Sequence, residues 1–206
     1  CSRRELPAPP EQPMRPAAPS PLDEFMPAFD ARERHAVTVR APADRVYEVA
    51  RQFDLQSVLL VRMIFTLRAK VMGATPVARK ARGFMEEMRG LGWGCLAERP
   101  GELFVAGAIC QPWLADVTFT PVAPERFRTF AEPGQVKIAW TIECRPEGPE
   151  RTLLVSETRV VATDEASRAR FLGYWRWARM GIIPIRWFLL PGIRKRAEAE
   201  DRRLRP

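Results

Sequence analysis

The sequence predicts an α+β domain in which an antiparallel sheet packs against one long C-terminal helix. Three patterns support this prediction. Apolar residues recur at helical spacing after residue 42, they alternate with a period of two between residues 93 and 163, and they return to helical spacing after residue 164. A sheet with one apolar face and a helix with an aromatic face are expected to cover each other.

The composition fits a single folded domain. The chain has 206 residues, of which 46% are hydrophobic and 28% charged, which argues against collagen, coiled coil and wholesale disorder. Its longest near-apolar runs, residues 58–65 and 180–190, each contain an arginine. Both are shorter than the roughly 20 residues that a membrane-spanning helix needs, so no such helix is expected.

Residues 1–27 are predicted to form a disordered, proline-rich N-terminal arm. They hold eight of the twenty prolines and few large apolar residues, so burial cannot offset the entropy of ordering them. The folded domain is placed at residues 30–206. Its first strand is expected near residue 33, because Val37 and Val39 alternate with smaller or polar residues. His35 is placed at the start of that strand, as the one candidate imidazole base or as a strand-end polar side chain.

Two short helices are expected after this strand. Pro42 suits the first turn of a helix, and Val46, Val49 and Ala50 recur at helical spacing, so the first helix should reach about Gln52. A second helix is expected over residues 57–72, which are apolar apart from three basic residues and precede a glycine. Residues 74–90 could form a further short helix.

A run of antiparallel strands is expected between residues 93 and 163. The clearest alternation covers residues 136–144, and a similar pattern covers residues 103–109. Further strands are expected at residues 93–98, 115–120, 125–130 and 152–162. Turn signals at residues 99–101 and 146–149 predict hairpins between neighbouring strands.

The closing helix is expected to begin at Asp164, a favourable N-cap residue. Its aromatic face is formed by Phe171, Tyr174 and Trp175. Because glycine and proline occur at residues 181, 184 and 191, we expect a kink or break before the basic tail that starts at Arg194.

The net charge of +8 favours anionic partners without identifying one. The excess lies in residues 62–89 and 164–206, where a membrane surface, nucleic acid or acidic substrate could be attracted. A solvated outer helix face is the simpler interpretation. No zinc-finger or RNP-type motif accompanies the charge, so specific nucleic-acid binding is not expected.

Cysteine and histidine usage argues against a metal site. The four cysteines are widely spaced, no CxxC motif occurs, and the chain has one histidine, so we expect no zinc and no cofactor. Buried free thiols are the default for the cysteines. We expect a cytoplasmic protein, with a membrane-anchored lipoprotein attached through Cys1 as the alternative.

Three stretches of the chain resemble a known superfamily. They are residues 41–47 (APADRVY), residues 130–134 (FAEPG) and residues 156–160 (SETRV), the last leading into residues 171–175 (FLGYW). The sequence resembles the START-like, Bet v 1-like superfamily, also called the polyketide cyclase/dehydrase or SRPBCC group, and within it an uncharacterised bacterial branch. The resemblance implies a helix-grip fold, in which a curved antiparallel sheet wraps around the last helix and leaves a cavity between them.

Such a cavity is expected to bind a hydrophobic small molecule or a lipid for transport or sensing, without catalysis. Aromatic side chains are the expected walls: Trp140, Phe171 and Trp175, with Trp93 and Trp113 as further candidates. Ordinary core packing is the competing interpretation of each. The oligomeric state is left open.

A second interpretation is a cyclase- or dehydrase-type enzyme that uses polar cavity residues. In one register of the strand at residues 152–162, Glu157 and Arg159 face the cavity and could bind a carboxylate or transfer a proton. In the other register residues 154, 156, 158 and 160 face the cavity, and Glu157 and Arg159 are an outer pair or a buried bridge between strands. We favour this structural role, and no catalytic residue is assigned.

A third interpretation is a membrane-surface or protein-interaction module. It would use the apolar run at residues 180–190 and the basic segment after it. Residues 187–190 are large and apolar and lie near Arg186 and Arg194, so this run could contact a lipid interface peripherally. The two prolines disrupt a long amphipathic helix, and packing on the domain is the simpler expectation.

Overall fold

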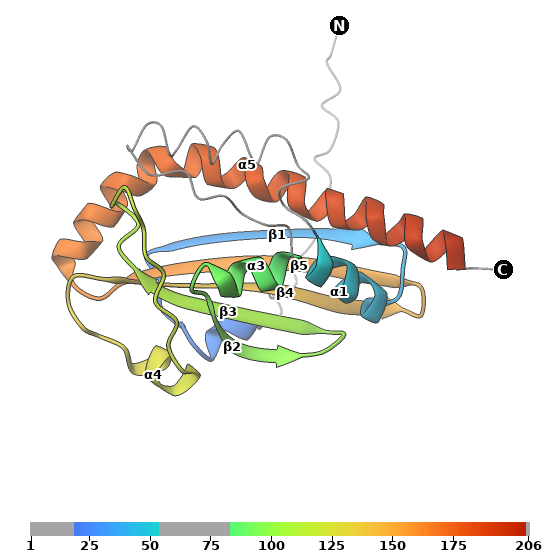
Figure 1. Cartoon of the computed structure of the whole chain (residues 1–206), viewed down its shortest axis with the longest axis horizontal. Coiled ribbons are helices and arrows are strands. Elements are labelled where there is room, and N and C mark those ends of the chain that lie inside the picture. The colour runs from blue at the N-terminus through green and yellow to red at the C-terminus, as the bar shows by residue number, and fades with distance from the viewer. Residues whose placement is uncertain (1–18, 54–82, 205–206) are drawn as a thin grey trace, which may run out of the picture.

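The computed structural model describes residues 19–53 and 83–204, without the side chains of residue 177 and residues 179–188. Its architecture is α+β with the helix-grip arrangement: a curved five-stranded antiparallel sheet lies beneath one long helix, α5 (Glu165–Leu204) (Figure 1). The fold class expected from the sequence is confirmed.

The strand order of the sheet is β1-β5-β4-β3-β2, so the first and last strands along the chain are neighbours. All four pairings are antiparallel. The strands are β1 (Ala31–Val39), β2 (Gly94–Arg99), β3 (Leu103–Cys110), β4 (Val136–Gly148) and β5 (Arg151–Ala162). Gly101 closes the tight β2–β3 hairpin with a positive φ of 83°, a conformation that glycine adopts without strain.

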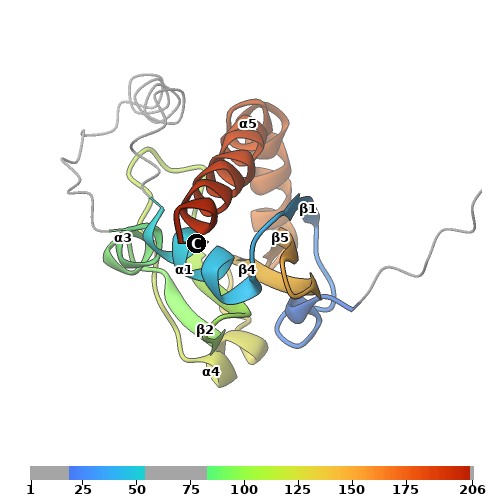
Figure 2. The ribbon, with the colours of Figure 1, turned by 90° about the vertical axis from the view of Figure 1, so that its right-hand side faces the viewer.

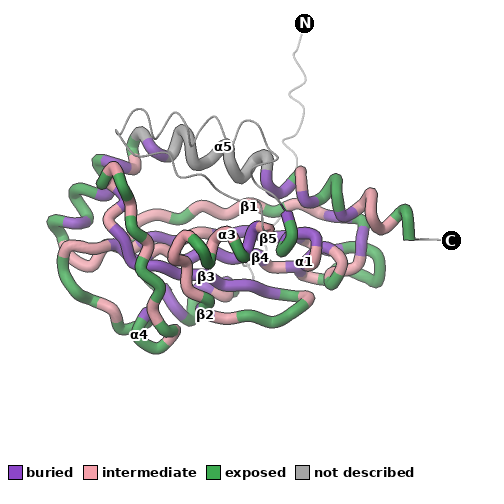
Figure 3. Tube along the Cα trace, viewed as in Figure 1, coloured by how far each residue is buried: buried purple, intermediate pink, exposed green. Residues whose placement is uncertain are grey.

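The two faces of the sheet are covered by different elements (Figure 2). The concave face packs against α1 (Ala43–Gln52), α3 (Phe84–Gly90) and α5, with Ile142, Leu154 and Ile193 in its core. The convex face is covered by the 3-10 helix η1 (Pro21–Asp23) and by α4 (Pro124–Thr129). Every residue of β3 is buried, which shows that both faces are covered at the centre of the sheet (Figure 3).

Several predicted elements differ from the structure. Residues 125–130 were expected to be a strand, but most of them belong to helix α4, because Pro124 suits a first helical turn and Phe127 is buried beneath it. Within residues 115–120, only a bridge between Thr120 and Ile109 joins the sheet. His35 is the fifth residue of β1 and not its first. The helix expected at residues 57–72 lies outside the described residues.

Residues 19–27, which were expected to be part of a disordered arm, pack on the domain. Residues 1–18 lie outside the described residues, but Ser20 caps η1, and Leu22, Phe25 and Met26 are buried on the convex face of the sheet. Burial of these three apolar side chains offsets the entropy of ordering the segment, so residues 19–27 pack as part of the domain.

Helix α5 begins after Asp164, as expected, because the Asp164 carboxylate accepts hydrogen bonds from the Ser167 backbone N–H (2.9 Å) and the Gly134 N–H (2.5 Å). The expected break does not occur, since α5 runs as one bowed helix through positions 181, 184 and 191 (Figure 1). A helix accommodates a proline by bending when its neighbours support it. No helix among the described residues meets the length and hydropathy needed to cross a membrane.

Candidate functional site

A strip of polar residues crosses an otherwise apolar part of the concave face. On β1, Glu33 pairs with Thr158 of β5, and His35 pairs with Ser156. Directly opposed residues on an antiparallel pair point to the same face. Because Leu154 and Val160 on β5 belong to the concave core, Ser156 and Thr158 lie on that face too, and so do their partners on β1.

Apolar pairs border this polar strip on both sides. Toward the start of β1 lies the pair Ala31–Val160, and toward its end lies the pair Val37–Leu154. The next strand, β4, places Trp140 beside Thr158 in the same register. The polar residues therefore lie where β1 pairs with β5, between apolar pairs on either side, and Trp140 is next to them.

The carboxylate and imidazole of the strip lie close together. The His35 Nε2 atom is 3.7 Å from the Glu33 carboxylate, and both side chains are partly exposed, whereas Ser156 is buried. The four residues, Glu33, His35, Ser156 and Thr158, together offer a carboxylate, an imidazole and two hydroxyl groups. We call them the concave polar strip.

Trp140 and Trp93 belong to an aromatic cluster on the β3–β4 side of the concave face. Trp140 is 7% exposed, and its ring centroid lies 5.1 Å from that of Phe84 and 5.6 Å from that of Phe104. Trp93 contacts Trp140 at 6.0 Å and stacks on Phe119 at 4.8 Å. These ring contacts bury much of the Trp140 side chain, so it packs as a core residue.

Phe171, Trp175 and Trp113 belong to a second cluster near the start of α5. Phe171 is buried and stacks on Trp175 with ring centroids 5.7 Å apart, and Trp113 packs against the same group. The five aromatic residues expected to line one cavity are thus divided between two clusters, with the concave polar strip on the β1–β5 seam beside them.

Glu157 and Arg159 lie on the opposite, convex face. The register in which Leu154, Ser156, Thr158 and Val160 face α5 is the one observed, because these four positions alternate with Glu157 and Arg159. The two charged side chains are 2% and 3% exposed. They are therefore the buried bridge and not a solvent-facing pair, and they are placed away from the space between the sheet and α5.

Glu157 and Arg159 each have several partners in this convex network. Arg159 donates from Nε to Glu157 and from Nη1 to the Met26 carbonyl, both at 2.7 Å, and pairs with Asp23 at 2.7 Å. Arg32 donates two hydrogen bonds to Glu157, at 2.9 and 3.2 Å. This arrangement ties the segment before β1 to the sheet, which is a structural role.

Opposing effects act on the pKa of Glu157. Burial alone raises the pKa of this carboxyl, but the hydrogen bonds from Arg32 and Arg159 and their positive charges outweigh burial and hold it below the ordinary value of 4.5. Glu157 is consequently an anion at neutral pH with its oxygens already engaged, which makes it a poor proton donor or acceptor for a ligand.

The described residues also line two cavities away from these aromatic clusters. One, of about 510 Å³, lies between the C-terminal half of α5 and the end of β1. The other, of about 230 Å³, lies between α1, α3 and β2 and is lined mainly by charged side chains. Beside it, Tyr47 donates a hydrogen bond to Glu98 (2.9 Å), and burial together with this contact raises the pKa of Tyr47.

No metal centre is built from the described part of the chain. Within residues 19–53 and 83–204, no group of three or more His, Cys, Asp or Glu side chains is placed to hold a metal ion. Cys110 and Cys144 are buried, and burial raises the pKa of the Cys144 thiol to about 12, which keeps it protonated and unreactive at neutral pH.

The concave polar strip was missed by sequence reasoning, although a signal for it existed. Alternation along residues 152–162 offered the observed register, in which Ser156 and Thr158 face α5. The partner residues Glu33 and His35 could not be found in this way, because the sequence does not reveal that β1 pairs with β5. The side chains of residues 180–188, which include most of the apolar run considered for membrane contact, lie outside the described residues.

Comparisons with known proteins were made for the whole chain. No protein-family model and no curated protein sequence matches it. The solved structure of TTHA0849 from Thermus thermophilus is similar with a TM-score of 0.32 and 14% identity, over 82% of this chain and 99% of that one. The Zhui aromatase/cyclase from a Streptomyces species gives a TM-score of 0.28 and 19% identity, over 85% and 96%.

A third similar structure is hypothetical protein jhp0584 from Helicobacter pylori, with a TM-score of 0.38 and 10% identity, over 90% of this chain and 99% of that one.

Proposed function

We propose that the protein binds a hydrophobic small molecule or lipid on the concave face of its sheet, beneath α5, in a carrier or sensor role without catalysis. The observation that supports this proposal is the concave polar strip, which interrupts an apolar face with hydrogen-bonding groups from two neighbouring strands. Binding sites for small molecules commonly combine apolar walls with a few polar groups that fix orientation.

The strip suggests which apolar ligands fit. A purely hydrocarbon ligand would cover these polar side chains with apolar surface and form no hydrogen bond with them. A ligand with an apolar body and one hydroxyl or carbonyl group could add a hydrogen bond at the strip. We therefore expect a preference for apolar molecules that carry a hydrogen-bonding group.

A matched pair of probes tests this proposal. Binding of 1-naphthol and of naphthalene is measured by native mass spectrometry and by thermal shift, for the wild type and for the double variant Ser156→Val and Thr158→Val. We expect the wild type to prefer 1-naphthol, and we expect the double variant to lose about threefold to tenfold in affinity for 1-naphthol alone, which is the scale of one lost hydrogen bond.

Thr118→Val is the control, because Thr118 is exposed and outside the sheet. The control should bind both probes as the wild type does. The proposal is wrong if neither probe nor a panel of fatty acids and aromatic alcohols binds the wild type, or if the double variant and the control behave alike.

One observation favours a second candidate function, an enzyme of the cyclase or dehydrase type. The Glu33 carboxylate and the His35 imidazole lie 3.7 Å apart on the concave face, and such a pair can accept and return a proton. In this case Glu33→Gln and His35→Gln would abolish turnover of a poly-β-ketone probe while leaving its binding in place. Binding without any product, in the wild type, supports the noncatalytic function.

A further inference from the structure

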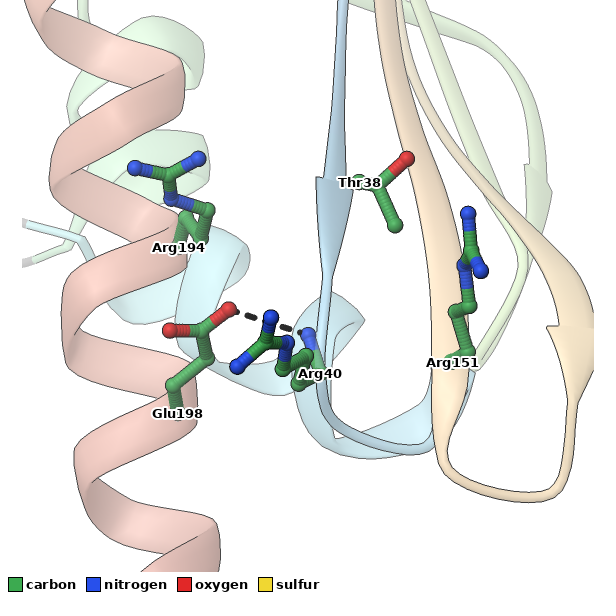
Figure 4. Close-up of a pocket in the computed structure, with 5 residues that line it drawn as sticks. All are labelled: Thr38, Arg40, Arg151, Arg194 and Glu198. Atoms are coloured by element: carbon green, nitrogen blue, oxygen red, sulfur yellow. Dashed lines mark hydrogen bonds between the residues drawn. The ribbon is translucent and has the colours of Figure 1, made fainter.

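The cavity between α5 and the end of β1 is lined mainly by arginine side chains. It has a volume of about 510 Å³ and is lined by Thr38, Arg40, Arg151, Arg194 and Glu198. Figure 4 shows Glu198 on α5 next to Arg40, which follows β1, with Arg194 one turn away on α5 and Arg151 on the far side of β1. Three different elements thus contribute one guanidinium group each.

Two of these guanidinium groups, those of Arg40 and Arg194, form no ion pair with a carboxylate of the described residues, although Glu198 lines the same cavity. Arg151 is paired with Glu147 at 3.0 Å. Glu198 accepts a hydrogen bond from the backbone N–H of Arg40 at 3.0 Å. Among the residues that the structure describes, no carboxylate comes within ion-pair distance of the guanidinium groups of Arg40 and Arg194.

The bond between Glu198 and the Arg40 backbone also fixes the cavity. It joins α5 to the end of β1, so Arg40 and Arg194 are held at a set spacing. The volume lies within the range typical of small-molecule sites, about 300–1,000 Å³, and exceeds what one bare ion fills.

We propose that this arginine cavity binds the phosphate group of an organic phosphate. The guanidinium fork matches phosphate oxygens in a bidentate geometry, and the three arginines of the lining outnumber its one carboxylate, Glu198, so the cavity attracts an anion. The same chemistry is offered by a soluble phosphorylated metabolite and by the headgroup of an anionic lipid. The cavity shares no residue with the concave polar strip, so this proposal can be tested separately from the proposed hydrophobic ligand.

The test uses one probe from each source. Glycerol 3-phosphate represents the soluble phosphate and is titrated by calorimetry at low and moderate salt. Vesicles of phosphatidylcholine with and without phosphatidic acid represent the lipid headgroup and are tested by flotation. We expect Arg40→Gln and Arg194→Gln each to weaken binding of the responding probe about tenfold, the scale expected for a lost charge-assisted hydrogen bond.

Arg202→Gln is the matched control. Arg202 is an exposed arginine on α5 outside the cavity lining, and its substitution removes the same charge as the two cavity variants. It should leave binding within about twofold of the wild type, since distant exposed charges are screened by salt. Unchanged thermal midpoints for all variants establish that folding is not the cause.

Each outcome decides the proposal. Binding of glycerol 3-phosphate that is lost in the two cavity variants supports a soluble ligand, and flotation that depends on phosphatidic acid and on the same two arginines supports a headgroup. No saturable binding of either probe to the wild type overturns the proposal. Binding that Arg202→Gln weakens as much as Arg194→Gln also overturns it, because the effect would then be one of overall charge.

Discussion

The polar residues on the convex and concave faces of the sheet differ in how far they are buried and in how many partners hold them. On the convex face, Glu157 and Arg159 are almost completely buried and are joined to each other, to Arg32, to Asp23 and to a backbone carbonyl. On the concave face, Glu33 and His35 remain partly exposed beside two hydroxyl residues. Alternate positions of the same two strands, β1 and β5, supply both groups.

This difference separates a structural from a functional use of charge. Buried ions need a full set of partners, because desolvation costs several kcal/mol per ion, and the convex network supplies that set internally. Side chains that bind a ligand must be able to form a hydrogen bond with it and must be accessible from solvent. The contrast therefore indicates that charge on the convex face holds the domain together, and it agrees with the proposal that a ligand binds at the concave polar strip.

Removing the convex carboxylate should produce the largest effect. Glu157→Gln takes away the anion that Arg32, Arg34 and Arg159 share, and we expect the free energy of unfolding to fall by about 3–5 kcal/mol, as for other broken buried pairs. Urea denaturation followed by circular dichroism measures this loss.

The same substitution on the other face provides the control. Glu33→Gln should change stability by less than about 1 kcal/mol, because partly exposed ion pairs contribute little. Equal losses in the two variants would contradict the proposed division between the faces.

Packing on the convex face should be the next most sensitive feature. A Cβ atom on Gly107 would lie 2.5 Å from Leu96 Cδ1 and 2.9 Å from a ring carbon of Phe127, so Gly107→Ala should destabilise the domain by about 1–3 kcal/mol through overpacking. Gly173→Ala on α5 meets nothing within 4 Å and should be neutral or stabilising by up to about 1 kcal/mol. Thermal denaturation distinguishes the two, and a stable Gly107→Ala variant would show that α4 is loosely packed.

The smallest expected effect is a dependence on pH at the joint between the sheet and α5. Hydrogen bonds from the Gly134 and Ser167 backbones and the Ser167 hydroxyl lower the pKa of Asp164 from 3.8 to about 2. The folded-state pKa is below the unfolded one, so the stabilisation is complete above about pH 5 and is lost as the pH falls through about 2.

Asp164→Asn isolates this contribution. The difference in unfolding free energy between wild type and variant should be constant above about pH 5 and should shrink toward pH 2, because the other titrating groups are common to both proteins. Urea titrations at several pH values measure it. A difference that does not vary with pH would mean that the carboxylate does not cap α5 as an anion.

Much of the fold could be predicted from the sequence because it depends on local patterns. The alternation over residues 136–144 and 152–162, the Asp164 cap and the long final helix all appear in the structure. Predictions failed where local and tertiary preferences conflict. Residues 125–130 were expected to be a strand, but they follow Pro124, which suits the first turn of a helix. For α5 a kink or break was expected, and the helix is bowed without a break.

The candidate site was harder to predict because it depends on which strands become neighbours. Trp140 and Phe171 were expected to face a common space, but ring contacts within each local cluster bury them separately. Glu157 and Arg159 were singled out as charges in an apolar strand. The partners of Glu157 include Arg32 and Arg34 on β1, and Arg159 also contacts the segment before β1. No local pattern in the sequence encodes such a long-range match.

The pairing of β1 with β5 has a consequence for how the protein is made. Glu33 and His35 are translated early, whereas their partners Thr158 and Ser156 emerge from the ribosome more than 100 residues later. Contacts so distant along the chain form slowly during folding. A nascent chain halted before β5 therefore carries only half of the concave polar strip, and the binding that we propose there would begin only after β5 has been made.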